Sequence, residues 1–109
     1  LPTTVTTDGI GRYSPEAEAA VYFCCLEAMQ NAGKHAGDGS TIEVKVWEEG
    51  GALSFEVADD GAGFDPAARQ TPGAGFVNMG DRVGAIGGTF GVQSAPGRGT
   101  RVSGRVPVA

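Results

Sequence analysis

The amino-acid sequence predicts an α+β fold, a two-layer sandwich in which helices cover one face of a mixed, mostly antiparallel sheet. Segments with alternating apolar residues follow one another closely enough to form hairpins at residues 41–57 and 89–106. Two other segments, residues 15–36 and 76–86, have apolar residues at helical spacing. A chain of 109 residues is long enough for one hydrophobic core, so we expect a single domain over residues 1–109.

The first predicted elements are a short strand at residues 3–7, which are mostly β-branched, and a long helix after it. Ser14 and Pro15 are typical of a helix start, because serine accepts hydrogen bonds from unpaired N–H groups and proline suits the first turn. Gly37 is suited to end this helix. The apolar residues at helical spacing, which predict its buried side, are Val21, Cys24, Cys25 and Ala28.

A hairpin is predicted after this helix. Apolar and polar residues alternate over residues 41–47 and again over residues 53–57. The sequence Glu-Glu-Gly-Gly at residues 48–51 is typical of the turn between two such strands. The second strand leads directly to Asp59, which we therefore expect at the end of a buried strand.

The second half of the chain predicts a loop, a short helix and a second hairpin. Residues 65–74 are rich in proline, glycine and alanine and show no apolar period. The last two strands, at residues 89–94 and 100–106, are joined by Ala-Pro-Gly-Arg-Gly. The apolar residues that mark the short helix are Phe76, Met79, Val83 and Ile86.

Composition argues against several classes of function. The net charge is −5, so the chain lacks the basic surface that binds nucleic-acid backbones, and we expect no direct nucleic-acid ligand. Cys24 and Cys25 are adjacent in an apolar stretch and badly placed to bond each other, which favours reduced core residues of a cytoplasmic protein. No apolar run reaches the roughly 20 residues that a membrane-spanning helix needs.

Unusual polar residues gather on the first helix. Glu27 and Asn31 lie one turn apart, and the ordinary interpretation of such a pair is a solvated helix face. Alternatively, the amide oxygen would be a hard ligand for Mg²⁺ and the carboxylate would orient or deprotonate a nucleophile. Lys34 would then meet phosphate charge, beside His35, which is the only histidine of the chain.

Three pairs of glycines lie at the ends of predicted elements. In most proteins such glycines serve only the turns. The middle pair opens the second helix, where exposed backbone N–H groups at the positive end of the helix favour an anion. The pairs are Gly61 and Gly63 after a strand, Gly73 and Gly75 before the helix, and Gly97 and Gly99 between the last two strands.

Asp59 has two interpretations. The simpler one is a carboxylate that caps a turn. The alternative is an acceptor for an exocyclic amine in an apolar pocket, because a site built on such a bond strongly rejects analogues that lack the amine.

Four segments, in this order along the chain, resemble a known family. The sequences EAMQNAGKHA, DDGAGF, GAGFVNMGDRV and GRGT are similar to the N, G1, G2 and G3 boxes of histidine-kinase ATP-binding domains. These domains belong to the Bergerat-type (GHKL) ATPases, with DNA gyrase, the heat-shock chaperone ATPase and MutL. The forms of the N and G2 boxes most resemble nitrate-type sensor kinases, which signal to helix-turn-helix response regulators. The resemblance implies the Bergerat ATP-binding fold, with ATP and Mg²⁺ as cofactors.

The resemblance also implies a role for each matching residue. Asn31 would bind the Mg²⁺ that bridges the ATP phosphates, and Glu27 would be the catalytic residue that helps to activate the attacking histidine. Asp59 would accept the adenine amino group, and Thr100 would support the adenine site, often through water. The other residues that it places at the nucleotide are Lys34 and His35 near the phosphates, Gly61 and Gly63 where the chain passes the nucleotide, and Gly73, Gly75 and Phe76 at the lid.

By this resemblance the chain would bind Mg-ATP and donate the γ-phosphate to a histidine on a separate dimerisation domain of a two-component sensor kinase, for relay to a response regulator. Since His35 lies inside the N box, we expect the acceptor histidine on helices upstream of residue 1. We expect this fragment to be a monomer that does not phosphorylate itself. Its parent would be a cytoplasmic or membrane-anchored homodimer.

Two alternatives remain open, a serine kinase of the anti-sigma-factor type and a non-catalytic ATP-sensing module. Two departures from the family pattern bear on nucleotide affinity. The segment between Phe64 and Gly73 is short for a kinase lid, and Gly80 stands where relatives often have arginine. Both departures lead us to expect weak or partner-dependent nucleotide binding.

Overall fold

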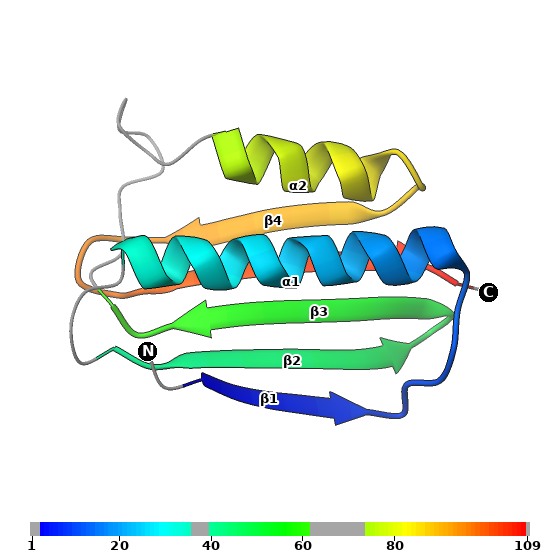
Figure 1. Cartoon of the computed structure of the whole chain (residues 1–109), viewed down its shortest axis with the longest axis horizontal. Coiled ribbons are helices and arrows are strands. Elements are labelled where there is room, and N and C mark those ends of the chain that lie inside the picture. Colours follow the sequence, from blue (N-terminus) through cyan, green and yellow to red (C-terminus); the bar gives the residue numbers. More distant parts are fainter. Residues whose placement is uncertain (1–2, 36–39, 62–73, 109) are drawn as a thin grey trace.

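A computed structural model describes residues 3–35, 40–61 and 74–108, with side chains for all of these except residues 34, 35, 74 and 75. The described residues form two layers, a five-stranded sheet and two helices on one of its faces (Figure 1). The elements are β1 (Thr3–Asp8), α1 (Pro15–His35), β2 (Ile42–Glu49), β3 (Ala52–Asp59), α2 (Ala74–Gly84), β4 (Thr89–Ser94) and β5 (Thr100–Pro107).

The sheet has the strand order β1-β2-β3-β5-β4. The pair β1–β2 is parallel, because α1 carries the chain back across the sheet between these strands. The pairs β2–β3, β3–β5 and β4–β5 are antiparallel. The α+β sandwich with a mixed, mostly antiparallel sheet, as predicted from the sequence, is therefore confirmed.

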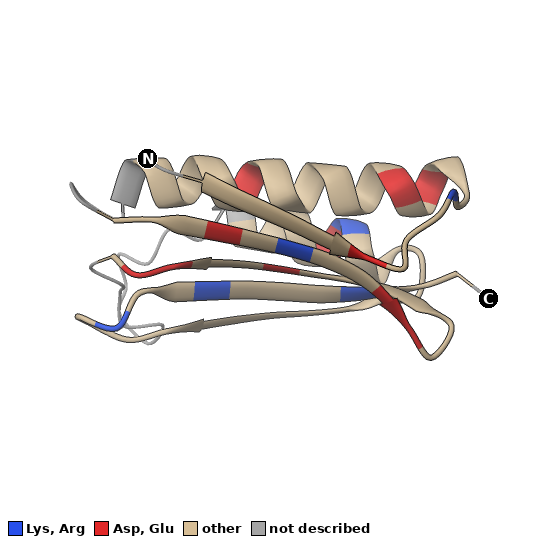
Figure 2. Ribbon diagram, turned by 90° about the horizontal axis from the view of Figure 1, so that it is seen from below, with Lys and Arg blue, Asp and Glu red and all other residues tan. Residues whose placement is uncertain are grey.

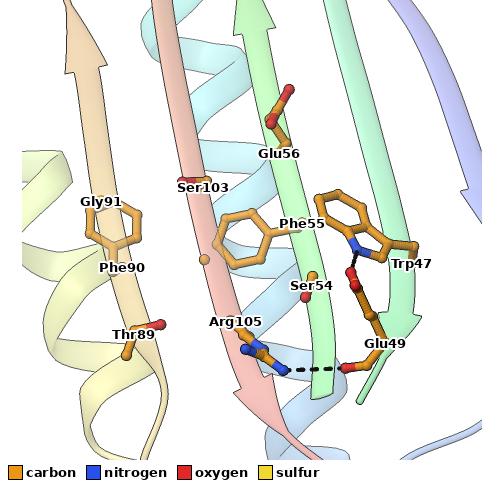
Figure 3. A pocket seen from close by; sticks show the side chains of 11 residues that line it. Trp47, Glu49, Ser54, Phe55, Glu56, Thr89, Phe90, Gly91, Ser103 and Arg105 are labelled. Carbon is orange, nitrogen blue, oxygen red and sulfur yellow. Dashed lines mark hydrogen bonds between the residues drawn. The ribbon is translucent and has the colours of Figure 1, made fainter. Parts of the chain in front are cut away.

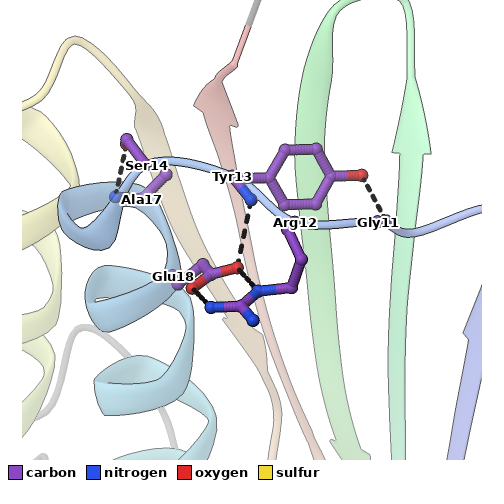
Figure 4. A network of polar contacts seen from close by, with 6 residues as sticks. All are labelled: Gly11, Arg12, Tyr13, Ser14, Ala17 and Glu18. Carbon is purple, nitrogen blue, oxygen red and sulfur yellow. Dashed lines mark hydrogen bonds and ion pairs between the residues drawn. The ribbon is translucent and has the colours of Figure 1, made fainter.

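The start of α1 matches the sequence prediction. The Ser14 hydroxyl accepts a hydrogen bond from the Ala17 N–H at 3.2 Å, as an N-cap residue does. The preceding loop is tied to the same helix end by Glu18, whose carboxylate accepts hydrogen bonds from both the Arg12 guanidinium and the Tyr13 N–H (Figure 4). These contacts, that with Arg12 first, lower the pKa of Glu18 to about 2.

The hydrophobic core lies between the sheet and the two helices. The predicted buried side of α1 is confirmed, since all four of its residues are buried. Burial raises the pKa of Cys24 to about 11 and that of Cys25 to about 12, and both are free thiols. The largest side chains that are almost completely buried are Phe55, Met79, Val83, Val106 and Cys24.

Several predicted boundaries differ from the structure by one or two residues, and two of these differences have a clear structural reason. Glu48 and Glu49 belong to β2 and pair with Leu53 and Ala52, so the first hairpin turns only at residues 50–51. Both turn glycines have positive φ, 60° and 78°. A tight hairpin turn needs positive φ at both of its central residues, so these two glycines are sufficient to connect the strands.

The second wrong boundary concerns Ile86, which lies beyond the end of α2 rather than within it. The Gly88 N–H donates to the Val83 carbonyl at 2.9 Å and closes the helix end. Ile86 nevertheless packs against the core, which explains why it follows the helical period.

Charged residues are spread along the elements rather than gathered on one surface in the view of Figure 2. Ion pairs join Lys45 to Glu43 at 3.1 Å and Arg101 to Glu56 at 3.5 Å, on the sheet face away from the helices. Neither helix of the described chain combines the length and the apolar character that crossing a bilayer requires.

Candidate functional site

The elements that carry the predicted site residues meet at one end of the molecule. The end of α1, the end of β3 and the beginnings of α2 and β5 all lie at the left of Figure 1. Asn31 is in the last turns of α1, Asp59 is the last residue of β3 and Thr100 is the first residue of β5. The topology thus brings residues that are far apart in the sequence to the same end of the fold.

Three polar residues form a row across the ends of neighbouring strands. Asp59 of β3 is the register partner of Thr100 of β5, and Thr100 is the partner of Ser94 of β4. Register partners point to the same face of a sheet. Asp59 follows the buried Phe55 and Val57 at intervals of two residues, so it points to the same face of the sheet as they do. The row is therefore on the face that the helices cover.

Asp59 is half-buried, and its two carboxylate oxygens differ in their surroundings. Oδ1 accepts a hydrogen bond from the Gly61 N–H at 2.9 Å. No residue in the described part of the chain donates to Oδ2. The simpler interpretation from the sequence, a carboxylate that caps a turn, is therefore correct for one oxygen, while the second oxygen remains as an acceptor.

Asp60 holds the end of β3 against the start of β2. Its Oδ1 accepts a hydrogen bond from the Thr41 N–H at 2.7 Å, and its Oδ2 accepts one from the Thr41 hydroxyl at 3.2 Å. The Thr41 N–H is the main cause of a lowered pKa of Asp60. Asp60 therefore fixes the backbone that carries Asp59, a role that the sequence did not single out.

Gly99 lies against the backbone of Asp59. A Cβ atom at position 99 would overlap the Asp59 carbonyl oxygen and would lie 3.1 Å from the Cα of Asp60. Gly99 also has a φ of 75°, which L side chains rarely adopt. The sequence predicted a turn glycine here, and the structure adds that only glycine lets β5 begin this close to the end of β3.

The ends of β3, β4 and β5 enclose a pocket of about 300 Å³, hereafter the strand-end pocket. Asp59, Ser94 and Thr100 line it, together with Arg98 and Arg101. The volume is at the lower end of the range of pockets that take small ligands. Carboxylate and hydroxyl oxygens beside guanidinium groups make it suitable for a polar ligand.

The α1 side of the site contains Glu27 and Asn31, which are both half-buried. The side-chain nitrogen of Asn31 is buried and has no hydrogen-bond partner in the described part of the chain. A buried amide without a partner is costly, about 1–3 kcal/mol, and is rare in native proteins. A ligand acceptor, such as a phosphate oxygen, that takes a hydrogen bond from the Asn31 side-chain nitrogen would remove this cost, so the residue fits a binding role.

The surroundings of Asn31 also fit Mg²⁺ held mainly by a ligand. Among the described residues, no group of three or more histidine, cysteine, aspartate or glutamate side chains could hold a metal ion. Mg²⁺ seldom needs such a group, because it keeps several waters and binds one or two protein oxygens together with substrate phosphates. The Asn31 amide oxygen would supply one such protein oxygen.

Several predicted site residues lie outside the part of the chain that the structure describes. Gly63 and Gly73 lie outside the described residues, as do the side chains of Lys34 and His35 at the end of α1. Gly75 is in the first turn of α2. Gly61 donates to Asp59, and the half-buried Phe76 packs against the core.

The sequence did not predict Ser94 as a site residue. Its hydroxyl lies 2.9 Å from the Thr100 hydroxyl and donates to the Gly99 carbonyl at 2.8 Å. The one signal in the sequence is its position, a polar residue at the end of a strand just before a turn. Such residues are common in turns, so this signal is weak.

A second hollow, of about 390 Å³, lies on the sheet away from the predicted residues (Figure 3). Trp47 donates from its indole N–H to the Glu49 carboxylate at 3.1 Å, and Arg105 donates to the Glu49 carbonyl at 3.4 Å. Phe55 lies over Gly104, where any Cβ atom would overlap its ring. No predicted site residue for which the structure describes a side chain or backbone position lines this hollow.

Comparison with known proteins gives a consistent assignment. Residues 16–109 match the family described as histidine kinase-, DNA gyrase B- and HSP90-like ATPases. The chain is 30% identical over 97 residues to the signal transduction histidine-protein kinase/phosphatase DegS of Brevibacillus brevis, covering 89% of this chain and 25% of that protein. It is 36% identical over 90 residues to the sensor histidine kinase YdfH of Bacillus subtilis, covering 80% of this chain and 22% of the relative.

The fold is also that of a solved kinase. The blue-light activated histidine kinase of Erythrobacter litoralis EL346 superposes with a TM-score of 0.84 at 21% identity, over 98% of this chain and 35% of that structure. The chain spans about a quarter of the length of the curated relatives that it matches. The chain belongs to the histidine kinase-, DNA gyrase B- and HSP90-like ATPases and has the fold of the ATP-binding catalytic domain of histidine kinases.

Proposed function

We propose that this chain binds Mg-ATP and donates the γ-phosphate to a histidine on a separate dimerisation domain of its parent sensor kinase. The observation that supports this most directly is the buried side-chain nitrogen of Asn31, which has no hydrogen-bond partner among the described residues, at the same end of the fold as Asp59 Oδ2, to which no described residue donates. One group suits metal-bound phosphate and the other suits an amine on a base.

Asp59 and Thr100 would hold the adenine, and Asn31 would hold the phosphates through the metal. Bound Mg²⁺ would neutralise phosphate charge and fix the phosphates for in-line transfer. The protein's part in phosphoryl transfer is mainly to position groups and stabilise charge. The separation of the two binding groups between a strand end and a helix therefore suits an elongated nucleotide.

Glu27 would act at the acceptor rather than at the nucleotide. Its half-buried carboxylate is one turn before Asn31 on α1, so an acceptor that approaches the phosphates from the α1 side would meet it. A carboxylate in that position would orient the acceptor imidazole and take its proton. This is the role that the resemblance to the N box implied.

The remaining predicted residues complete the proposal. Lys34 and His35 would lie near the phosphates, at the end of the helix that carries Asn31. Gly73 and Gly75 would hinge the lid, with Phe76 packed behind them. Gly61 and Gly63 would let the chain pass close to the nucleotide.

The partners follow from the same proposal. The acceptor histidine would belong to dimerisation helices of the parent kinase, which would be a cytoplasmic or membrane-anchored homodimer. A helix-turn-helix response regulator would receive the phosphate, as in nitrate-type sensor kinases. Nucleic acid would be contacted only by that regulator.

Transfer of label tests this function. The chain is incubated with ATP labelled at the γ-phosphate, with and without the dimerisation domain of the parent kinase. We expect label on the dimerisation domain only, in an acid-labile form because phosphohistidine hydrolyses in acid. Acid-stable label on a serine would instead indicate a serine kinase of the anti-sigma-factor type. ATP binding without any transfer of label would indicate a non-catalytic ATP-sensing module.

Two variants separate catalysis from binding in the same assay. Glu27→Ala should bind ATP with unchanged affinity but transfer phosphate about 10²-fold to 10⁴-fold more slowly, because a proton acceptor is lost. Glu16→Ala makes the same change in the exposed first turn of α1 and should leave the rate unchanged. Transfer by the Glu27 variant at the wild-type rate would remove this residue from the mechanism.

A further inference from the structure

We propose that Ser94 turns the Thr100 hydroxyl into a hydrogen-bond acceptor toward the nucleobase, and that this makes the strand-end pocket select adenine over bases with a carbonyl group at the same position. The inference rests on the proposed function, because it assumes that the base lies against Asp59 and Thr100. It adds a residue, Ser94, and a physical basis for the choice of base.

The direction of the Thr100 hydroxyl follows from hydrogen-bond accounting. Ser94 has one hydroxyl proton, and its oxygen lies 2.8 Å from the Gly99 carbonyl, which accepts hydrogen bonds but does not donate them. The same oxygen lies 2.9 Å from the Thr100 hydroxyl oxygen. If both contacts are hydrogen bonds, the Ser94 proton points to Gly99, so Thr100 must donate to Ser94.

Thr100 then has no proton left for a ligand. Its hydroxyl oxygen offers only lone pairs to the strand-end pocket. Asp59 is the register partner of Thr100, and no described residue donates to its Oδ2. The row therefore presents two neighbouring acceptors, a hydroxyl oxygen and a carboxylate oxygen, on one side of the pocket.

A surface of this kind distinguishes bases by their exocyclic group. The amino group of adenine has two N–H donors, which match two acceptors directly or through a bound water. Hypoxanthine and guanine have a carbonyl oxygen at that position, which would face two acceptors and lose its own hydrogen bond with water. Selection of adenine would thus depend on the Ser94–Thr100 pair as well as on Asp59.

The test is the ratio of the affinities for ATP and inosine triphosphate, measured by calorimetry on the whole chain with Mg²⁺. Inosine differs from adenosine by a carbonyl in place of the amino group and by a proton on the neighbouring ring nitrogen. In Ser94→Ala the Thr100 proton is free to point into the pocket and donate to that carbonyl. We expect the preference for ATP to fall about fivefold to tenfold, the effect of one hydrogen bond.

Three variants distinguish this role from a merely structural one. Ser94→Thr keeps the hydroxyl and should restore the wild-type ratio. Ser103→Ala makes the same change on β5, at a half-buried residue outside the strand-end pocket, and should not alter the ratio. In a Thr100→Val background, Ser94→Ala should have no further effect, because there is no hydroxyl left to redirect.

The outcomes separate this inference from the proposed function. If the wild-type chain binds ATP and Ser94→Ala has the same ratio of ATP to inosine triphosphate affinity as the wild type, the role of Ser94 is wrong. The proposed function would then remain intact. If Ser94→Thr does not restore the ratio, or if Ser94→Ala acts equally without the Thr100 hydroxyl, the proton-direction mechanism is also wrong. Absence of nucleotide binding to the wild-type chain would overturn both.

Discussion

Gly99 lies directly against the carbonyl group of Asp59, with 3.0 Å between a Cβ atom built at position 99 and the Asp59 carbonyl carbon. This contact joins the turn before β5 to the end of β3, and so places Thr100 beside Asp59. The geometry of the site therefore depends on a residue that has no side chain.

A comparison of two glycine variants tests this contact. Gly99→Ala must displace the Asp59 backbone, so we predict a loss of about 2–4 kcal/mol in the free energy of unfolding together with weaker ATP binding. Gly97→Ala has nearly the same φ, 76°, but open space around its Cβ, so it should cost only the strain of a left-handed backbone, about 1–2 kcal/mol. Chemical denaturation and calorimetry measure both quantities. Equal effects of the two substitutions would show that the contact with Asp59 is unimportant.

Asp59→Asn tests the carboxylate as the acceptor for adenine. The amide oxygen of asparagine can still accept from the Gly61 N–H, so the fold should persist, while a charge-assisted bond to the base is lost. We predict a loss of roughly 1.5–3 kcal/mol in the binding free energy of ATP by calorimetry. Asp81→Asn, on the exposed side of α2, makes the same charge change as a control. Equal ATP affinity in wild type and Asp59→Asn would remove Asp59 from the adenine pocket.

Glu18 predicts a dependence of stability on pH that is independent of nucleotide. Its pKa is lowered from 4.5 to about 2, chiefly by the hydrogen bond from Arg12. A carboxylate with a lowered pKa stabilises the fold above its ordinary pKa, and this contribution is lost as the pH falls through the folded-state value. The wild type should therefore be more stable than Glu18→Gln at pH 7, and the difference should shrink between about pH 4.5 and pH 2.

Denaturant titrations of both proteins across this range measure the effect. Because Glu18 is partly exposed, we expect a small difference that added salt reduces further. Glu16→Gln serves as the control, since Glu16 is exposed on the same turn and forms no ion pair with the described residues. A difference that stays constant with pH would contradict the ion pair with Arg12.

The adjacent cysteines should be inert in the folded protein. Burial raises both pKa values, to about 11 and 12, so almost no thiolate forms near neutral pH. We predict that a thiol reagent such as Ellman's reagent modifies Cys24 and Cys25 only at the rate of unfolding. The reaction should become fast in denaturant. Rapid modification under native conditions would show that the side of α1 that carries Cys24 and Cys25 is accessible to the reagent.

A feature of the fold or of the site could be predicted where the residues that cause it are close together in the sequence. The cap at Ser14, the buried side of α1 and the position of Asp59 at a strand end follow from residues close in sequence, and the structure confirms them. The turn at residues 50–51 was placed too broadly, because polar residues such as Glu48 and Glu49 suit an exposed strand end as well as a turn. Their assignment is decided by pairing with β3.

The type of fold and the family could be inferred from the amino-acid sequence alone, because alternation, helical spacing and four ordered motifs are properties of short segments. Three contacts at the site become evident only in the folded molecule: Ser94 with Thr100, Asp60 with Thr41, and Gly99 with Asp59. Gly99 precedes β5 and Asp59 ends β3, two strands that are neighbours in the sheet but not consecutive in the chain. Which side chains lie opposite one another is set by the register of whole strands, even where the partners are as close in sequence as Ser94 and Thr100, and no local pattern records that register.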